Sequence, residues 1–105
     1  MNVLDHMTQD EATVLAAVLL DGGKDQELMD AFADYDFATP WVGGQAWLME
    51  RMYTKGQEIN VITLYECDVE EFGEADACPI ELLNAICQYI QPREKAMAIL
   101  RATKP

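Results

Sequence analysis

Apolar residues near the start of the chain recur at the spacing of an α-helix. They occupy positions i, i+1, i+4 and i+5 of one stretch: Val14, Leu15, Val18 and Leu19. Residues at these spacings share one helix face, so the pattern predicts a helix over 11–20 with one buried side. Thr8 and Glu11 have the spacing of a capping box at its start. Gly22-Gly23 ends it, because glycine readily adopts the left-handed conformation of a helix C-terminus.

Five further segments carry helix start and stop signals, at 25–33, 40–55, 61–71, 79–90 and 92–102. Thr39-Pro40 marks one start and Asn60 another, since proline suits the first helical position and asparagine caps free amides. The residues expected to face inward are apolar: Leu28, Met29, Phe32, Ile80, Leu83, Ile86, Ile90, Ala96, Ile99 and Leu100. The pattern predicts a compact all-α bundle of about six short helices. We expect one helical domain over 8–105 and a flexible N-terminus at 1–7.

Two adjacent glycines interrupt the third predicted helix. Gly43 and Gly44 together cost about 2 kcal/mol relative to alanine at the same positions. That cost predicts either close helix packing at this point or a weak first turn.

The charge of the chain narrows its possible ligands. It has 19 acidic and 7 basic residues, a formal net charge of −12 at pH 7. A protein that binds a duplex needs clustered lysine and arginine, so we expect no direct binding of nucleic acid. The longest apolar run, 14–20, is much shorter than the roughly 20 residues that span a membrane. No leader peptide is evident, and three cysteines without paired spacing indicate reduced thiols and a cytoplasmic location.

The sequence lacks the residues that most catalytic sites require. The sequence contains no serine and one histidine, His6, near its start. Lys24 follows two glycines but is followed by Asp25, so the phosphate-binding loop pattern is not met. The cysteines and His6 do not have the spacing of a zinc site, and the acidic stretch 66–76 matches a calcium loop only in part. We therefore assign no catalytic, cofactor-binding or metal-binding residue and predict that the chain is not an enzyme.

Charge is unevenly distributed along the chain. Residues 66–76 include six acids and no base, whereas the segment after Gln91 has four bases and one acid. One interpretation is a solvated acidic loop followed by a helix whose bases match its dipole. The other is a polarised surface that orients a partner.

Two stretches together match a known pattern. Residues 11–21 read EATVLAAVLLD. The second stretch runs from Phe37 through Thr39-Pro40 to residues 53–64, which read YTKGQEINVITL. They resemble the N-terminal domain of DnaB-type replicative DNA helicases, in which Phe-x-x-Pro is followed by about twelve helical residues and Tyr-x-Lys-Gly-x-x-Ile-Asp-x-(Val/Ile)-Thr-Leu. A weaker similarity continues through 80–90 and 91–101.

The resemblance implies an orthogonal helical bundle with a docking role. In that family the domain forms the collar of the helicase hexamer, pairs with a neighbouring copy, and receives the C-terminal domain of the primase or a helicase loader. The chain departs from the pattern at 41–46 and at Trp47, and it has no ATPase motif, so unwinding is not carried over. The residues predicted to bind a homodimer or replication partner are Trp41, Trp47, Met49, Met52, Tyr53, Arg93 and Arg101. For the tryptophans, methionines and tyrosine, the alternative is a place in the core.

Other hypotheses remain at this stage. The chain is either a domain of a helicase or a small stand-alone protein, as a phage might encode, that modulates a helicase or primase. A rival is an acidic mimic of nucleic acid that presents 66–76 to a basic enzyme. A third is an enzyme that uses the same acids to hold a metal.

Overall fold

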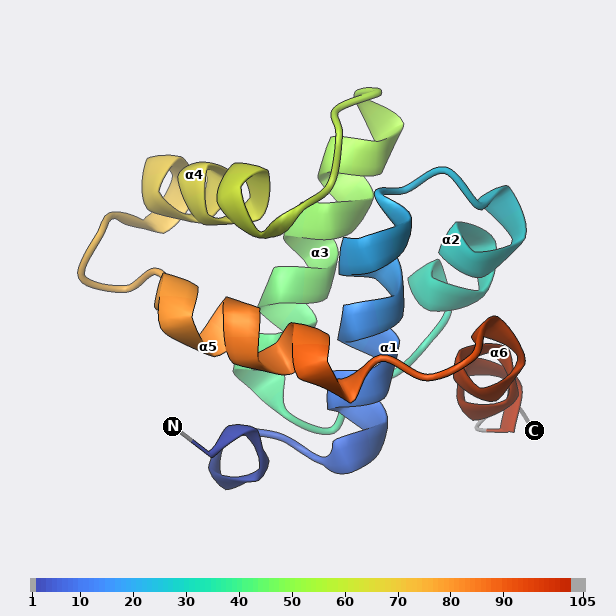
Figure 1. Cartoon of the computed structure of the whole chain (residues 1–105). Helices are drawn as coiled ribbons and strands as arrows, with labels where there is room; N and C mark the ends of the chain where they lie inside the picture. Colours follow the sequence, from blue (N-terminus) through green and yellow to red (C-terminus); the bar gives the residue numbers. More distant parts are fainter. Residues whose placement is uncertain (1, 103–105) are drawn as a thin grey trace.

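The computed structural model describes residues 2–102, and these form helices without strands (Figure 1). There are six α-helices and two 3-10 helices in this part of the chain: η1 (Val3–Asp5), α1 (Gln9–Asp21), α2 (Gln26–Ala33), α3 (Pro40–Thr54), α4 (Val61–Phe72), α5 (Ile80–Ile86), η2 (Cys87–Tyr89) and α6 (Arg93–Ala102). The prediction of an all-α fold with about six short helices is confirmed. Thr103, Lys104 and Pro105, the end of the predicted domain, lie outside the described residues.

Helix α1 is the centre of the domain. Every residue from Glu11 to Leu19 is buried, although the sequence pattern predicts only one buried face. The helix is covered on several sides, because α2, α5, η2 and α6 all pack against it (Figure 1). An apolar helix without a polar face is typical of such a central position.

The ends of the helices follow local sequence signals. The capping box of α1 is confirmed, since Thr8 Oγ1 accepts from the Glu11 amide and Glu11 Oε1 accepts from the Thr8 amide. Gly22 adopts the left-handed conformation with φ of 79° and ends α1. Asn60 caps α4 in a second box, which it closes with Thr63.

Thr39 differs from the prediction. Its side chain makes no capping hydrogen bond to α3. Instead its hydroxyl donates to Glu11 Oε1 at 2.7 Å, and its amide donates to Glu11 Oε2 at 2.9 Å. The buried carboxylate of Glu11 therefore joins the start of α1 to the start of α3. The Thr39 hydroxyl donates to this charged acceptor instead of accepting from an amide of α3 as a cap.

The end of α1 meets the α3–α4 corner. The Ile59 amide donates to the Gly22 carbonyl at 3.3 Å, and Ile59 is fully buried. Gly23 has a φ of +83°, and a Cβ there would lie 2.9 Å from Ile59 Cδ1 and 3.6 Å from Tyr53 Cδ1. Glycine is therefore required here both by the backbone and by the space available.

Of the two alternatives predicted at Gly43-Gly44, close helix packing is absent. A Cβ on Gly44 would meet nothing within 4 Å, and one on Gly43 would only touch Phe37 Cβ at 3.9 Å. The gap beside Gly44 opens into a pocket described below.

Two expectations about the C-terminal third of the chain are corrected. The predicted helix over 79–90 ends at Ile86 and continues as η2, which turns Ile90 outward with 46% of its surface exposed. Ile80 and Ile99 are only partly buried, whereas Leu82 and Met97 belong to the core. At the N-terminus, expected to be flexible, residues 2–7 pack onto the domain with Val3 and Met7 buried.

Candidate functional site

Two of the residues predicted to bind a partner lie in the core. Met49 is fully buried and Met52 is 1% exposed. They share the inward face of α3 with Leu48, because residues three and four apart lie on one helix side. Both methionines are core residues, so their predicted place on a partner-binding surface is wrong.

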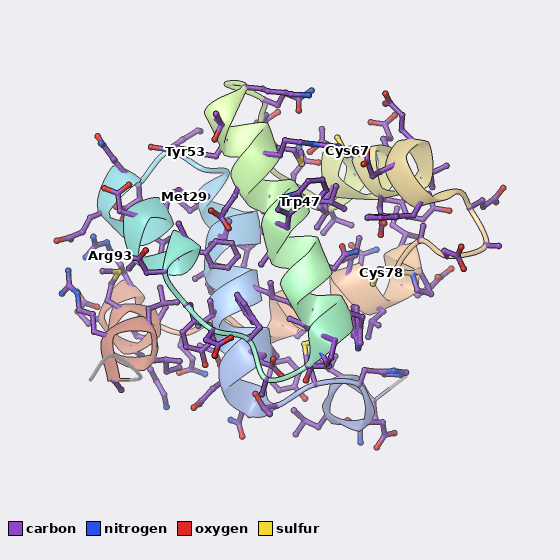
Figure 2. The ribbon with its side chains drawn as sticks, turned by 180° about the vertical axis from the view of Figure 1, so that it is seen from behind. Met29, Trp47, Tyr53, Cys67, Cys78 and Arg93 are labelled. Carbon is purple, nitrogen blue, oxygen red and sulfur yellow. The ribbon has the colours of Figure 1, made fainter. Side chains whose placement is uncertain are left out.

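Tyr53 is also part of the packing. It is half-buried at the corner beside Gly23, where it packs against the core cluster. Its ring supports the junction between α1 and the α3–α4 corner. Figure 2 shows Tyr53 at the upper end of α3, away from Trp47.

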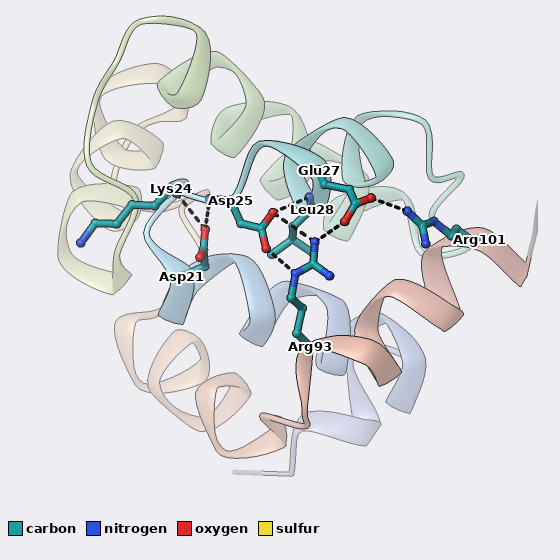
Figure 3. A network of polar contacts seen from close by, with 7 residues as sticks. All are labelled: Asp21, Lys24, Asp25, Glu27, Leu28, Arg93 and Arg101. Atoms are coloured by element: carbon teal, nitrogen blue, oxygen red, sulfur yellow. Dashed lines mark hydrogen bonds and ion pairs between the residues drawn. The ribbon is translucent and has the colours of Figure 1, made fainter.

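Arg93 and Arg101 are engaged within the chain (Figure 3). Arg93 pairs with Asp25 and Glu27, and Arg101 Nη2 lies 3.0 Å from Glu27 Oε2. Hydrogen bonds from Arg93 hold the pKa of Asp25 and that of Glu27 below their usual values. The two arginines therefore tie α6 to the N-terminal end of α2, and they remain partly exposed.

Trp41 and Trp47 are both exposed on α3. Trp41 Nε1 donates to the His6 carbonyl at 3.1 Å, and Trp47 exposes 48% of its surface. The Arg51 guanidinium lies 4.7 Å from the Trp47 ring centroid and pairs with Glu71 of α4 at 3.0 Å. Figure 2 shows Trp47 on the side of α3 that faces α4. Together with the exposed Phe72 at the end of α4, Trp41 and Trp47 form what we call the exposed aromatic surface.

A pocket of about 570 Å³ opens beside Trp41. Gly44 lies three residues from each tryptophan and leaves space between them. Phe72, at the end of α4, is exposed and also lines the pocket. The lining comes from α3, α4, α5, His6 and the segment between α4 and α5: His6, Trp41, Gly44, Gln45, Asp68, Phe72, Asp76, Ala77, Cys78, Pro79 and Leu82. A cavity of this size with apolar walls and a few polar groups has the properties of a ligand pocket.

Two buried polar side chains line this pocket. Asp68 is 1% exposed and Gln45 is 6% exposed. Asp68 Oδ2 accepts from Gln45 Nε2 at 2.7 Å and from the Cys78 amide at 2.8 Å. Asp68 Oδ1 and Gln45 Oε1 have no hydrogen-bond partner among the residues that the structure describes. Such orphaned acceptors are uncommon in folded proteins and call for an explanation.

In the sequence, Asp68 is one of six acids in the 66–76 stretch. The structure separates it from the other five, which are exposed. The burial of Asp68 could have been predicted, because Asp68 is four residues after the buried Leu64 and therefore falls on the inward face of α4. Gln45 gave a similar signal, since it lies on the inward face of α3, three residues before Leu48.

Cys78 is buried at the edge of the pocket. Burial and the nearby Asp68 carboxylate raise the pKa of its thiol to about 12. The thiol therefore stays protonated at neutral pH and is a poor nucleophile. Within residues 2–102, no group of three or more His, Cys, Asp or Glu is placed to hold a metal ion.

No helix in the described part of the chain is both long enough and apolar enough to cross a bilayer. Comparisons of the chain with protein-family models, with curated proteins and with solved structures found no match.

Proposed function

We propose that this chain is a non-catalytic docking module of DNA replication, which assembles with a second copy or binds a replicative helicase, a primase C-terminal domain or a helicase loader. The exposed aromatic residues Trp41, Trp47 and Phe72 carry the proposal, and two of them, Trp41 and Phe72, line the pocket. Tryptophan supplies a large contact area at a low entropy cost and is enriched where interfaces are tightest. A solvated face of α3 and α4 with no binding role has no need for these rings.

The link to replication rests on the resemblance to DnaB-type N-terminal domains. Its two stretches, 11–21 and 37–64, supply α1, α3, the corner and the start of α4. The Ile59 amide in the second stretch donates to the carbonyl of Gly22, the residue directly after the first stretch, so the two stretches lie side by side at this corner. Of the departures from the family pattern at 41–47, Trp41 and Trp47 fall on the exposed aromatic surface, whereas Val42, Gln45 and Ala46 are buried. We infer that this module selects its partner on that surface.

Size-exclusion chromatography with light scattering tests the proposal. The chain is measured alone and mixed with a replicative helicase or a primase C-terminal domain, at low and high salt. We expect a dimer or a salt-tolerant complex, because aromatic contacts are screened little by salt. Trp47→Ala should weaken the complex, whereas Leu20→Ala, also exposed but on α1, should not. The proposal is contradicted if the chain is a monomer and binds neither the helicase nor the primase domain.

A second function is favoured by a separate observation. Five acids are exposed between α4 and α5 or on α4: Glu66, Glu70, Glu71, Glu74 and Asp76. A stand-alone acidic regulator, or a mimic of nucleic acid, would present them to a basic replication protein. Its complex would dissociate steeply as salt increases, and the chain alone would stay monomeric. The same chromatography therefore separates the two functions.

A further inference from the structure

We propose that the pocket between Trp41 and Phe72 binds an arginine side chain of the partner. This inference rests on the proposed docking role, since it names the group of the partner that enters the surface. It starts from Asp68 Oδ1 and Gln45 Oε1, two buried acceptor oxygens on residues that line the pocket, which have no partner among residues 2–102.

The polarity of these two atoms defines what the ligand must supply. The Asp68 carboxylate can only accept, so the Gln45 amide must turn its nitrogen toward Asp68 Oδ2, and this leaves Gln45 Oε1 on the other side. Both unpaired atoms are therefore acceptors. A ligand that satisfies them must carry at least two donors.

The charge of the lining selects a cation. Asp68 and Asp76 line the pocket, and none of the lining residues is a lysine or an arginine. A ligand carboxylate or phosphate would place a second negative charge beside a buried one, which is unfavourable at low dielectric. A cation instead compensates Asp68, whose burial would otherwise be costly.

The apolar walls favour a guanidinium over an ammonium. Trp41 and Phe72 provide aromatic surfaces, and Pro79 and Leu82 extend the apolar lining. The guanidinium is planar, stacks on aromatic faces, is less strongly hydrated than an ammonium, and holds several donors in a rigid fork. The three methylene groups of arginine would contact the apolar walls.

Nuclear magnetic resonance of the 15N-labelled full chain provides the test. The probes are three blocked tripeptides, Ala-Arg-Ala, Ala-Lys-Ala and Ala-citrulline-Ala, because citrulline keeps the shape of arginine and removes its charge. We expect Ala-Arg-Ala to shift the signals of the Gln45 side-chain amide and the Trp41 indole in a saturable manner, with a dissociation constant below about 10 mM. The lysine peptide should bind more weakly, and the citrulline peptide should not saturate.

Two variants with matched controls locate the binding. Asp68→Asn keeps an acceptor for the Gln45 and Cys78 hydrogen bonds but removes the charge, so affinity should fall by about tenfold or more. Its control, Glu74→Gln, removes an exposed charge outside the lining and should have little effect. Phe72→Ala should weaken binding a few-fold, whereas Ile62→Ala, equally on the surface of α4, should not. If Asp68→Asn does not fold, the Phe72 and Ile62 variants decide the outcome.

Several results would overturn the inference. The first is that Ala-Arg-Ala causes no saturable shifts, and the second is that the citrulline peptide binds as tightly as the arginine peptide. The third is that Phe72→Ala and a folded Asp68→Asn both bind Ala-Arg-Ala as tightly as the unchanged chain does. The docking role fails separately. If the helicase or primase binds but Asp68→Asn leaves that complex intact, docking stands and the arginine pocket is refuted. If Ala-Arg-Ala binds and neither replication protein does, the pocket stands and the proposed partner is refuted.

Discussion

Replacement of Glu11 by glutamine should destabilise the domain far more than a surface change does. The Glu11 carboxylate is buried and accepts three hydrogen bonds, from the Thr8 amide, the Thr39 amide and the Thr39 hydroxyl. In Glu11→Gln the remaining oxygen can keep the bonds on the Oε1 side. The new NH2 group then faces the Thr39 amide, 2.9 Å from the present Oε2, so that two donors oppose each other.

The magnitude follows from the bonds that are lost. A hydrogen bond to a charged group contributes about 1.5–3 kcal/mol, and a buried amide left without an acceptor costs about 1–3 kcal/mol. Because these two effects overlap, we expect Glu11→Gln to lower the free energy of unfolding by about 2–4 kcal/mol. This is a large part of the roughly 5–15 kcal/mol that stabilises a small domain.

The pH dependence gives an independent check. Burial raises the pKa of Glu11, but the hydrogen bonds from Thr8 and Thr39 together outweigh it and lower the pKa below its ordinary 4.5. A carboxyl group with a lowered pKa stabilises the fold above the unfolded-state pKa, and this contribution is lost as the pH falls through the folded-state pKa. The difference between the two proteins should therefore be full at pH 7 and shrink below about pH 4.5.

Urea unfolding followed by circular dichroism measures the change. Asp10→Asn is the matched control, because Asp10 is exposed in the same first turn and its loss should cost only about 0.3–1 kcal/mol through the helix dipole. The reasoning is refuted if Glu11→Gln costs no more than Asp10→Asn, or if its deficit persists unchanged in acid.

Three further predictions concern other parts of the fold. Gly44→Ala should raise the free energy of unfolding by about 1 kcal/mol, because the new Cβ meets open space within a helix. Gly23→Ala should lower the free energy of unfolding, because Gly23 has a positive φ and its Cβ would lie 2.9 Å from Ile59 Cδ1. The melting temperatures of the two variants should therefore shift in opposite directions. The Cys78 thiol should react with iodoacetamide at pH 8 only as fast as the domain unfolds. Peptide mapping separates it from the partly buried Cys67 and Cys87, and rapid alkylation of Cys78 itself in the folded chain would contradict its high pKa. Arg93→Gln should lower the melting temperature slightly at low salt and less at high salt, and a salt-independent loss would show that its ion pairs do not act as described.

Much of the fold could be predicted because its signals are local. The capping boxes at Thr8 and Asn60 and the glycine after α1 act within a few residues, so the sequence alone indicates the helix boundaries. The burial of α1 on all sides could not be predicted in this way. It depends on which distant helices pack against α1. The spacing of apolar residues within one helix does not contain that information.

The candidate site was predictable only in part. Trp41 and Trp47 stand out by residue type, and both are exposed. Arg93 pairs with Asp25, 68 positions away in the sequence, and no local pattern records such a pairing. Asp68 was hidden by its acidic neighbours, although its place on the inward face of α4 distinguishes it from them.

The burial of residues 11–19 of α1 has a consequence for how the chain folds during synthesis. Helix α1 leaves the ribosome before the other five α-helices of the described residues, whereas η2 and α6, which cover it, follow more than 60 residues later. A helix this apolar then remains uncovered until nearly the whole domain has been translated, and such surfaces are prone to aggregation and are bound by chaperones. Contacts between distant parts of the sequence also slow folding relative to helical bundles held by local contacts. Removal of α6 would therefore uncover the central helix, and we expect a shortened chain without 93–102 to be degraded or to aggregate during expression.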